Sequence, residues 1–180
     1  MRRRDLLAGL AGAATLGTGA YAVSGTDILG SGTDCVDPIE LTAVDAPGSP
    51  EQTLTVPEPG RVTLVEFFAT WCDVCAASMT PLGEAYDRVG DDVQFVSVTN
   101  EPLGHAVTRE EIREWWVEHD GNWPVAPDED LALTEALGAS AVPMVAILDA
   151  DNVVTWTAKG KHSAETIVNH ITEAGGEGGG

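Results

Sequence analysis

The sequence predicts an α/β domain with a mixed central sheet and helices on both faces of that sheet. Three segments are nearly continuously apolar, which is typical of strands covered on both sides: residues 61–69, 93–99 and 144–148. Segments with helical signals alternate with these strands. A hairpin turn at 149–152, a returning strand at 153–157 and a last helix follow. This order of elements is typical of a mixed sheet with helices on both faces.

Shorter elements complete the predicted domain. Two alternating segments, 39–44 and 53–56, precede the first core strand and predict an N-terminal strand extension; Pro57-Glu58-Pro59-Gly60 ends the second. A helix is expected over 74–89. The other three expected helices have polar residues at their starts, which accept hydrogen bonds from orphan N–H groups: Thr108 with Glu111, Asp128 before a helix to Leu137, and Ser163 before a helix to Glu173.

The charge of the chain excludes some partners. Its 180 residues include 29 acidic and 9 basic ones, and the only lysines are Lys159 and Lys161. Such a surface repels nucleic acid and anionic lipid, so neither is expected as a partner. The acid excess fits an ordinary solvated face, but the depletion of lysine favours adaptation to high salt, as in a halophile, where self-repulsion is screened.

The chain begins with a targeting pattern. Residues 1–22 contain Arg2-Arg3-Arg4, a weakly apolar run, and an A-x-A cleavage site at Ala20-Tyr21-Ala22. Arg3-Arg4-Asp5-Leu6-Leu7 resembles the twin-arginine export signal. The alternative is an uncleaved membrane anchor through residues 6–22, and both interpretations predict export to the extracytoplasmic side.

The remaining boundaries follow from composition. Residues 23–38 have the composition of a linker, which contains the unpaired Cys35, residues 39–174 form the domain, and residues 175–180 are a disordered Gly-rich tail.

Cys72 and Cys75 form a C-x-x-C motif between a predicted buried strand and a predicted helix. Two intervening residues bring the sulfur atoms within bonding distance in one helical turn, and a helix N-terminus stabilises a thiolate at the first position. Cys72 is therefore the predicted nucleophile and Cys75 the resolving cysteine. The alternatives are an inert pair or half of a zinc site. Zinc needs further ligands, whereas the four histidines are scattered singly, so no metal or other cofactor is expected.

The segment Phe67-Phe68-Ala69-Thr70-Trp71-Cys72-Asp73-Val74-Cys75 resembles the active site of thioredoxin-like proteins, above all exported TlpA-like and ResA-like disulfide reductases. Ala141-Val142-Pro143-Met144 resembles their second signature, a cis-proline loop. The resemblance covers residues 39–174 and implies the thioredoxin fold, with an inserted helix. It also implies that Pro143 is cis and lies against the C-x-x-C, where Trp71, the Val142 backbone and Pro143 bind an extended substrate peptide.

Glu66 interrupts a predicted core strand six residues before Cys72. Buried carboxylates are rare, and the resemblance assigns Glu66 the buried acid that exchanges a proton with the resolving cysteine. Desolvation should raise the pKa of Glu66 toward neutrality. The alternative is a solvated Glu66 at a sheet edge.

Three positions depart from the family pattern. Val74 replaces a common proline, Ser78 replaces the glutamate of ResA-like proteins, and Pro81 lies one position later than usual. The residues between the cysteines influence the redox potential, so the direction of electron flow stays open.

The sequence predicts a thiol–disulfide oxidoreductase, with reduction favoured, that acts on partner proteins bearing disulfides or thiols and draws electrons from an unidentified donor protein. One alternative is a copper chaperone of the Sco type, which uses C-x-x-x-C and a distant histidine. The other is a binding domain of the thioredoxin fold without catalysis.

Overall fold

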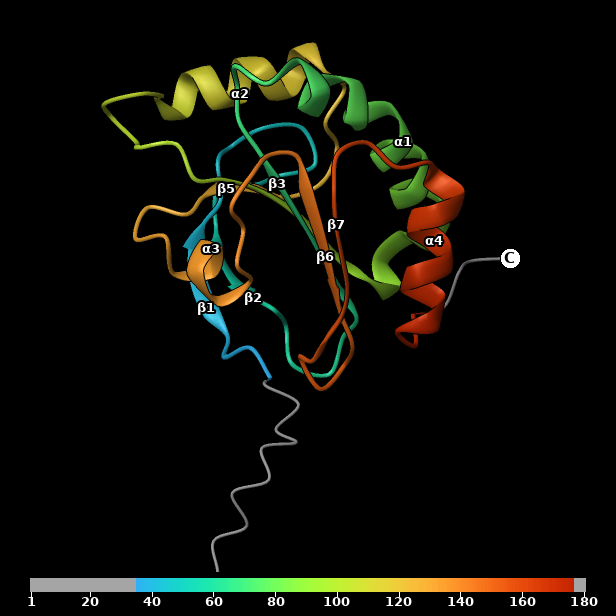
Figure 1. Cartoon of the computed structure of the whole chain (residues 1–180). Helices are drawn as coiled ribbons and strands as arrows, with labels where there is room; N and C mark the ends of the chain where they lie inside the picture. Colours follow the sequence, from blue (N-terminus) through green and yellow to red (C-terminus); the bar gives the residue numbers. More distant parts are fainter. Residues whose placement is uncertain (1–34, 177–180) are drawn as a thin grey trace, which may run out of the picture. The chain divides into compact units, whose positions relative to one another are not determined.

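A five-stranded mixed sheet in the order β5-β4-β3-β6-β7 forms the centre of the domain (Figure 1). Strands β3, β4 and β5 are parallel, β6 runs antiparallel to β3, and β7 runs antiparallel to β6. The five strands are β3 (Thr63–Phe68), β4 (Gln94–Thr99), β5 (Val125–Pro127), β6 (Met144–Leu148) and β7 (Val154–Lys159). The predicted mixed sheet is confirmed.

The computed structural model describes residues 35–176. The predicted signal segment 1–22, the part of the linker before residue 35 and the last four residues of the tail lie outside the described residues. No helix within residues 35–176 is long and apolar enough to cross a membrane.

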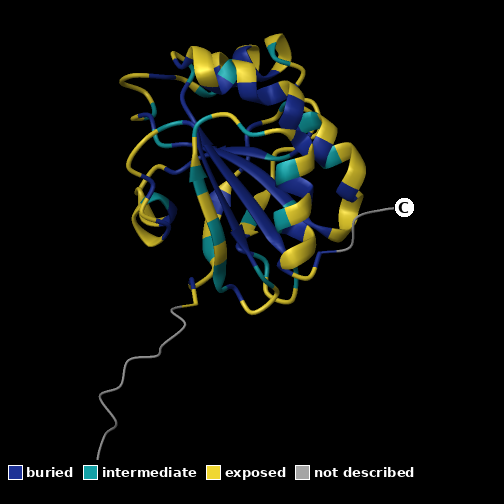
Figure 2. Cartoon of the chain, turned by 45° about the vertical axis from the view of Figure 1, so that its right-hand side comes forward, coloured by how far each residue is buried: buried dark blue, intermediate teal, exposed yellow. Residues whose placement is uncertain are grey.

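Helices cover both faces of the sheet, as predicted. One face packs against α1 (Asp73–Val89), α4 (Ala164–Glu173) and the aromatic side of α2 (Arg109–Glu118). The other face packs against α3 (Ala132–Ala136) and a separate antiparallel pair, β1 (Ile39–Thr42) and β2 (Thr53–Val56). This pair is the predicted N-terminal strand extension. Figure 2 shows the central strands as buried along their length beneath these layers.

The alternation of side chains in β3 separates the two cores. Leu64 and Phe68 point into the core beneath α1 and α4, and Val65 and Phe67 point into the opposite core. Because side chains alternate along a strand, Glu66 lies on the same face as Leu64 and Phe68. All six residues of β3 are buried, so the strand is covered on both faces as its apolar composition predicts.

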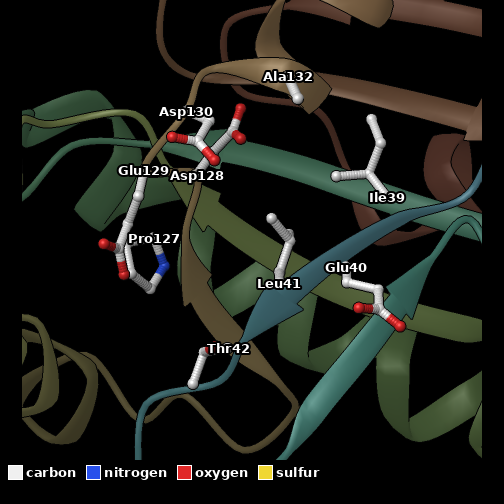
Figure 3. A pocket seen from close by; sticks show the side chains of 9 residues that line it. All are labelled: Ile39, Glu40, Leu41, Thr42, Pro127, Asp128, Glu129, Asp130 and Ala132. Atoms are coloured by element: carbon white, nitrogen blue, oxygen red, sulfur yellow. The ribbon is translucent and has the colours of Figure 1, made fainter.

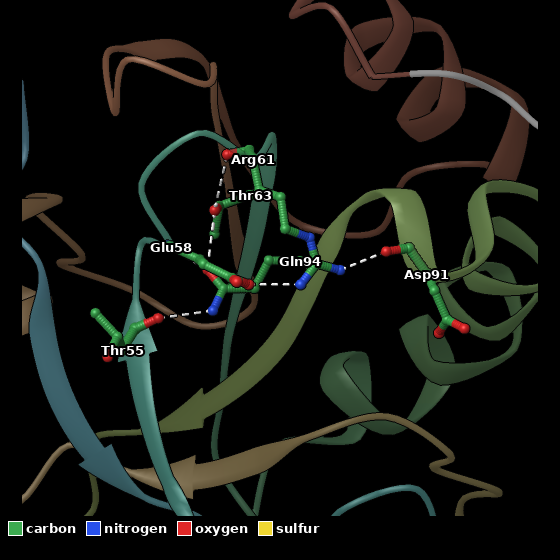
Figure 4. Close-up of polar contacts among 6 residues, drawn as sticks. All are labelled: Thr55, Glu58, Arg61, Thr63, Asp91 and Gln94. Carbon is green, nitrogen blue, oxygen red and sulfur yellow. Dashed lines mark hydrogen bonds and ion pairs between the residues drawn. The ribbon is translucent and has the colours of Figure 1, made fainter.

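Polar contacts attach the β1–β2 sheet to the central sheet. The Gln94 side chain donates to the Thr55 carbonyl at 2.7 Å and accepts from the Glu58 N–H at 2.8 Å (Figure 4). Arg61 pairs with Glu58 and donates to the Asp91 carbonyl at 2.6 Å. These bonds connect β2 and the loop after it to the start of β4 and to η1 (Gly90–Asp92), the short 3-10 helix that precedes β4.

Two of the three predicted helix caps are confirmed. Thr108 and Glu111 form a capping box at α2, and Ser163 accepts from the Thr166 N–H at α4. The predicted cap at Asp128 was wrong in position, because a turn from Asp128 to Leu131 precedes the helix and Leu131 is its N-cap. The Asp128 carboxylate still accepts from the Thr134 N–H at 2.7 Å.

Ordered contacts extend beyond both ends of the predicted domain. Cys35 pairs with Val153 in an isolated bridge, and the Val36 N–H donates to the Asn152 carbonyl at 2.9 Å. At the other end, the Gly176 N–H donates to the Ile171 carbonyl at 2.9 Å and closes α4. The packed structure thus includes residues assigned from composition to the linker and to the tail.

Candidate active site

The cysteines of the C-x-x-C motif form a disulfide where β3 passes into α1. The Cα atoms of Cys72 and Cys75 are 5.2 Å apart. Cys72 is the N-cap of α1, and its Sγ accepts a hydrogen bond from the Cys75 N–H at 3.1 Å. In the reduced protein this N–H and the positive end of the helix dipole would stabilise a thiolate on Cys72.

The two sulfur-bearing residues differ in burial. Cys72 is 7% exposed, whereas Cys75 is fully buried in the core beneath α1. A partner protein can therefore approach only the first cysteine. The assignment of Cys72 as the attacking group and of Cys75 as the resolving group stays a prediction, which this difference in exposure favours.

An apolar surface flanks the disulfide. The Trp71 side chain is 73% exposed and Val74 is 49% exposed, although most large apolar residues of the described chain are buried. Exposed apolar residues of this size, when they lie together, mark interaction sites more often than chance exposure. Trp71 and Val74 thus give the region around Cys72 the character of a contact surface.

The peptide bond between Val142 and Pro143 is cis, as the resemblance implied. Met144 pairs with Phe67 in the antiparallel β3–β6 register, so Pro143 continues beside the end of β3 that leads to the disulfide. The Pro143 carbonyl accepts from the Gly160 N–H at 2.9 Å. The sheet thus brings the proline loop and the C-x-x-C motif, which are far apart in sequence, to the same end.

Glu66 is fully buried in the middle of β3, on the face that α1 covers. Its neighbours in the sheet are Val145 on β6 and Ser97 on β4. The same core contains Cys75 and Met79 of α1. The interpretation of Glu66 as a solvated residue at a sheet edge is therefore wrong.

Burial determines the protonation of Glu66. Desolvation raises the pKa of Glu66 from its ordinary value of 4.5 to about 7, and the nearby Ser97 hydroxyl opposes this effect weakly. Neither carboxylate oxygen has a hydrogen bond of normal geometry among the described residues. Ser97 Oγ accepts from Trp123 Nε1 at 2.9 Å, which leaves the Ser97 hydroxyl hydrogen available to face Glu66. A carboxyl group with this pKa can give or accept a proton near neutral pH.

A second buried carboxylate lies at the disulfide end of the sheet, and the sequence reasoning missed it. Glu101 follows β4, is 7% exposed, and accepts hydrogen bonds from the Thr70 N–H at 2.7 Å and from the Thr70 hydroxyl at 3.1 Å. Acidic residues just after strands are common in solvated loops. Nothing in the sequence therefore distinguishes Glu101 from the other acidic residues.

The hollow shown in Figure 3 does not belong to this site. It has a volume of about 280 Å³ and lies between β1 and the segment from Pro127 to Ala132. Its lining is acidic, and one of its carboxylates, Asp128, is engaged by α3. None of its lining residues comes from the disulfide region.

The sequence profile of the Redoxin family matches residues 35–173. The chain belongs to the Redoxin family. This Redoxin-family chain is 30% identical over 89 residues to the thiol-disulfide oxidoreductase YkuV of Bacillus subtilis, a match that covers 49% of the chain and 60% of YkuV. It is 22% identical over 113 residues to the thiol-disulfide oxidoreductase ResA of Bacillus thuringiensis subsp. konkukian, covering 62% of each protein. The chain thus spans about three fifths of these relatives.

Solved structures share the fold of this Redoxin-family chain. The exposed lipoprotein thioredoxin Etrx1 of Streptococcus pneumoniae has a TM-score of 0.64 at 25% identity, covering 76% of this chain and 98% of Etrx1. A secreted disulfide oxidoreductase of Mycobacterium tuberculosis has a TM-score of 0.62 at 14% identity, covering 75% of this chain and 95% of that protein. The thioredoxin-like fold implied by the sequence motifs is confirmed.

Proposed function

We propose that this protein is an extracytoplasmic thiol–disulfide oxidoreductase that reduces disulfides in partner proteins through Cys72 and Cys75. The observation that carries the proposal is the position of the disulfide. Its first sulfur occupies the N-cap of α1 and accepts an N–H, while its second sulfur is buried. The relatedness to thiol-disulfide oxidoreductases supports this chemistry.

The reaction begins with the reduced protein. The Cys72 thiolate attacks one sulfur of a partner disulfide, forming a mixed disulfide and releasing the other partner sulfur as a thiolate, which takes up a proton. Glu66 accepts the proton of the Cys75 thiol, and the resulting Cys75 thiolate attacks Cys72 Sγ. The second partner sulfur leaves as a thiolate and takes up a proton from solvent, so two electrons pass to the partner and Cys72–Cys75 is oxidised.

A donor protein would restore the dithiol by the reverse exchange. The raised pKa of Glu66 suits its role in both directions, because a group that titrates near 7 can take the Cys75 proton and later return it.

The location and the salt environment are parts of the same proposal. The N-terminal targeting pattern supports export, with residues 6–22 retained as an anchor or removed by cleavage. The exposed and secreted relatives are consistent with this location. The formal net charge of −20 supports a high-salt environment, and a surface of this charge favours neutral or basic client segments over acidic ones.

A redox titration tests the proposed function and its direction. The purified protein is equilibrated with graded ratios of oxidised and reduced dithiothreitol, and the Cys72–Cys75 state is read by thiol labelling. We expect a reduction potential of about −270 mV, the value typical of a reducing thioredoxin. A reduction potential of about −120 mV, as in the oxidant DsbA, would reverse the proposed direction. A disulfide that does not exchange at all would contradict the function.

Trp71 should affect the affinity for protein substrates rather than the chemical step. We expect Trp71→Ala to raise KM for insulin about tenfold, because exposed aromatic residues contribute strongly to protein contacts when they become buried. The rate with the small disulfide of oxidised glutathione should stay within twofold. Val117→Ala, which removes another half-exposed apolar side chain from α2, is the matched control. Equal KM values for Trp71→Ala and the wild type would contradict the assignment.

A further inference from the structure

The turn that presents Cys72 is short and has one strong side-chain anchor. The Cys72 N–H donates to the Ala69 carbonyl at 3.1 Å, so residues 69–72 form a β-turn with Thr70 and Trp71 at its centre. Trp71 is exposed and contributes little to holding this turn. The geometry of Cys72 at the start of α1 therefore depends on what holds Thr70.

Glu101, in the loop just after β4, holds Thr70. Its Oε2 accepts from the Thr70 N–H at 2.7 Å, and its Oε1 accepts from Thr70 Oγ1 at 3.1 Å. Thr99 in turn fixes Glu101, because Thr99 Oγ1 donates to Oε2 at 3.1 Å and accepts from the Glu101 N–H at 3.3 Å. Both oxygens of the buried Glu101 carboxylate thus accept hydrogen bonds, and within the turn these bonds come from Thr70.

We propose that Glu101 is a positioning residue that sets the reactivity of Cys72 by fixing the backbone and hydroxyl of Thr70. This inference rests on the proposed function for its biological meaning. It concerns the geometry of Cys72 and not the proton transfer by Glu66, and it assigns the effect to the hydrogen bonds of Glu101 rather than to its charge.

The bond pattern allows the hydrogen bonds to be separated from the charge. In Glu101→Gln, the amide oxygen can take the place of Oε2 and accept from the Thr70 N–H and from Thr99 Oγ1. The amide nitrogen can take the place of Oε1 and donate to Thr70 Oγ1, since a hydroxyl also accepts. Glu101→Gln therefore keeps the contacts and removes the charge, whereas Glu101→Ala removes both.

Alkylation of the reduced protein tests the proposal. The rate at which iodoacetamide labels Cys72 at pH 7 reads the exposure and thiolate character of its sulfur. We expect this rate to fall about tenfold in Glu101→Ala and to stay within twofold of the wild type in Glu101→Gln. Thr70→Val removes the hydrogen bond from Thr70 Oγ1 to Glu101 and keeps Glu101 itself. It should lower the alkylation rate about threefold, and it replaces Glu101→Ala as the test if that variant does not fold.

Asp128 offers a matched control for general destabilisation. It is also a buried carboxylate, and it accepts from the N–H and the hydroxyl of Thr134, both at 2.7 Å. The hydrogen bonds of its side chain go to the start of α3 and not to the turn of residues 69–72. Asp128→Ala should lower the melting temperature as Glu101→Ala does, but leave the alkylation rate within twofold of the wild type.

Three results would overturn the positioning role. The first is a wild-type alkylation rate in Glu101→Ala, the second is an equal decrease in Glu101→Gln and Glu101→Ala, and the third is an equal decrease in Asp128→Ala. Insulin reduction is measured in parallel. A wild-type protein that does not reduce insulin, while Glu101→Ala still slows alkylation, would contradict the proposed function and leave the positioning role supported.

Discussion

Replacing Cys72 with serine is expected to lower the rate of insulin reduction by on the order of 1,000-fold or more, because a serine hydroxyl is not ionised near neutral pH. Cys72 is the sulfur-bearing residue that remains accessible, and its Sγ accepts the Cys75 N–H at the start of α1. Replacing Cys75 with serine should have a different effect. Cys72 can still attack, but the mixed disulfide with the partner cannot be resolved, and it should accumulate.

Mass spectrometry under non-reducing conditions separates these outcomes. Cys75→Ser should carry a covalently attached insulin chain, and Cys72→Ser should not. Cys35→Ser is the matched control: Cys35 is exposed, is not disulfide-bonded and lies at the opposite end of the sheet, so the rate should stay within twofold of the wild type. Accumulation of the mixed disulfide in Cys72→Ser instead would reverse the two roles.

Glu66 should make the oxidised protein less stable as the pH rises. Its pKa is raised from 4.5 to about 7 in the folded state, so between these values the folded protein binds more protons than the unfolded chain. The contribution of Glu66 to the free energy of unfolding is therefore at its full value below about pH 4.5, and it falls as the pH rises to about 7. The full loss corresponds to about 3 kcal/mol of unfolding free energy.

Glu66→Leu tests this linkage by denaturant unfolding of the oxidised protein at pH 5 and pH 8. The difference in unfolding free energy between the variant and the wild type should shift in favour of the variant by about 2.5 kcal/mol on going to pH 8, because part of the full loss has already occurred at pH 5. Glu84→Gln removes an exposed carboxylate from α1 and controls for the loss of one negative charge. A difference that does not change with pH would show that Glu66 does not titrate in this range.

The same residue should matter for turnover. Glu66→Gln retains the shape of the side chain but cannot accept the Cys75 proton, and we expect the release of the mixed disulfide to slow on the order of tenfold or more. The pH profile of the variant should also lack the increase near pH 7 that ionisation of Glu66 gives the wild type. Identical kinetics from pH 6 to pH 9 would remove Glu66 from the mechanism.

The sequence predicted those parts of the fold that depend on local patterns. The apolar segments of β3, β4 and β6, the capping box at Thr108 and the cap at Ser163 are all encoded by residues close together in the chain, and each is found in the structure. Strand β5 was missed because Val125–Pro127 is only three residues long and ends in proline. Such a segment is too short to show a period.

The site was predictable where residue type alone carries chemistry. Two cysteines at this spacing and an acid inside an apolar strand are conspicuous in the sequence. The cis bond at Pro143 could be expected only from the family resemblance, and the second cis bond, between Val56 and Pro57, had no such signature. Glu101 was missed because its role depends on Thr70, 31 residues away, which only the pairing of β3 with β4 brings near.

The bridge between Cys35 and Val153 fixes which end of the sheet the start of the described chain occupies. Val153 follows the turn after β6, at the end of the sheet where Thr63 begins β3, whereas the disulfide follows the other end of β3. The six residues of β3 separate these ends by about 20 Å. Cys35, where the described part of the chain begins, thus lies at the end of the sheet opposite to Cys72.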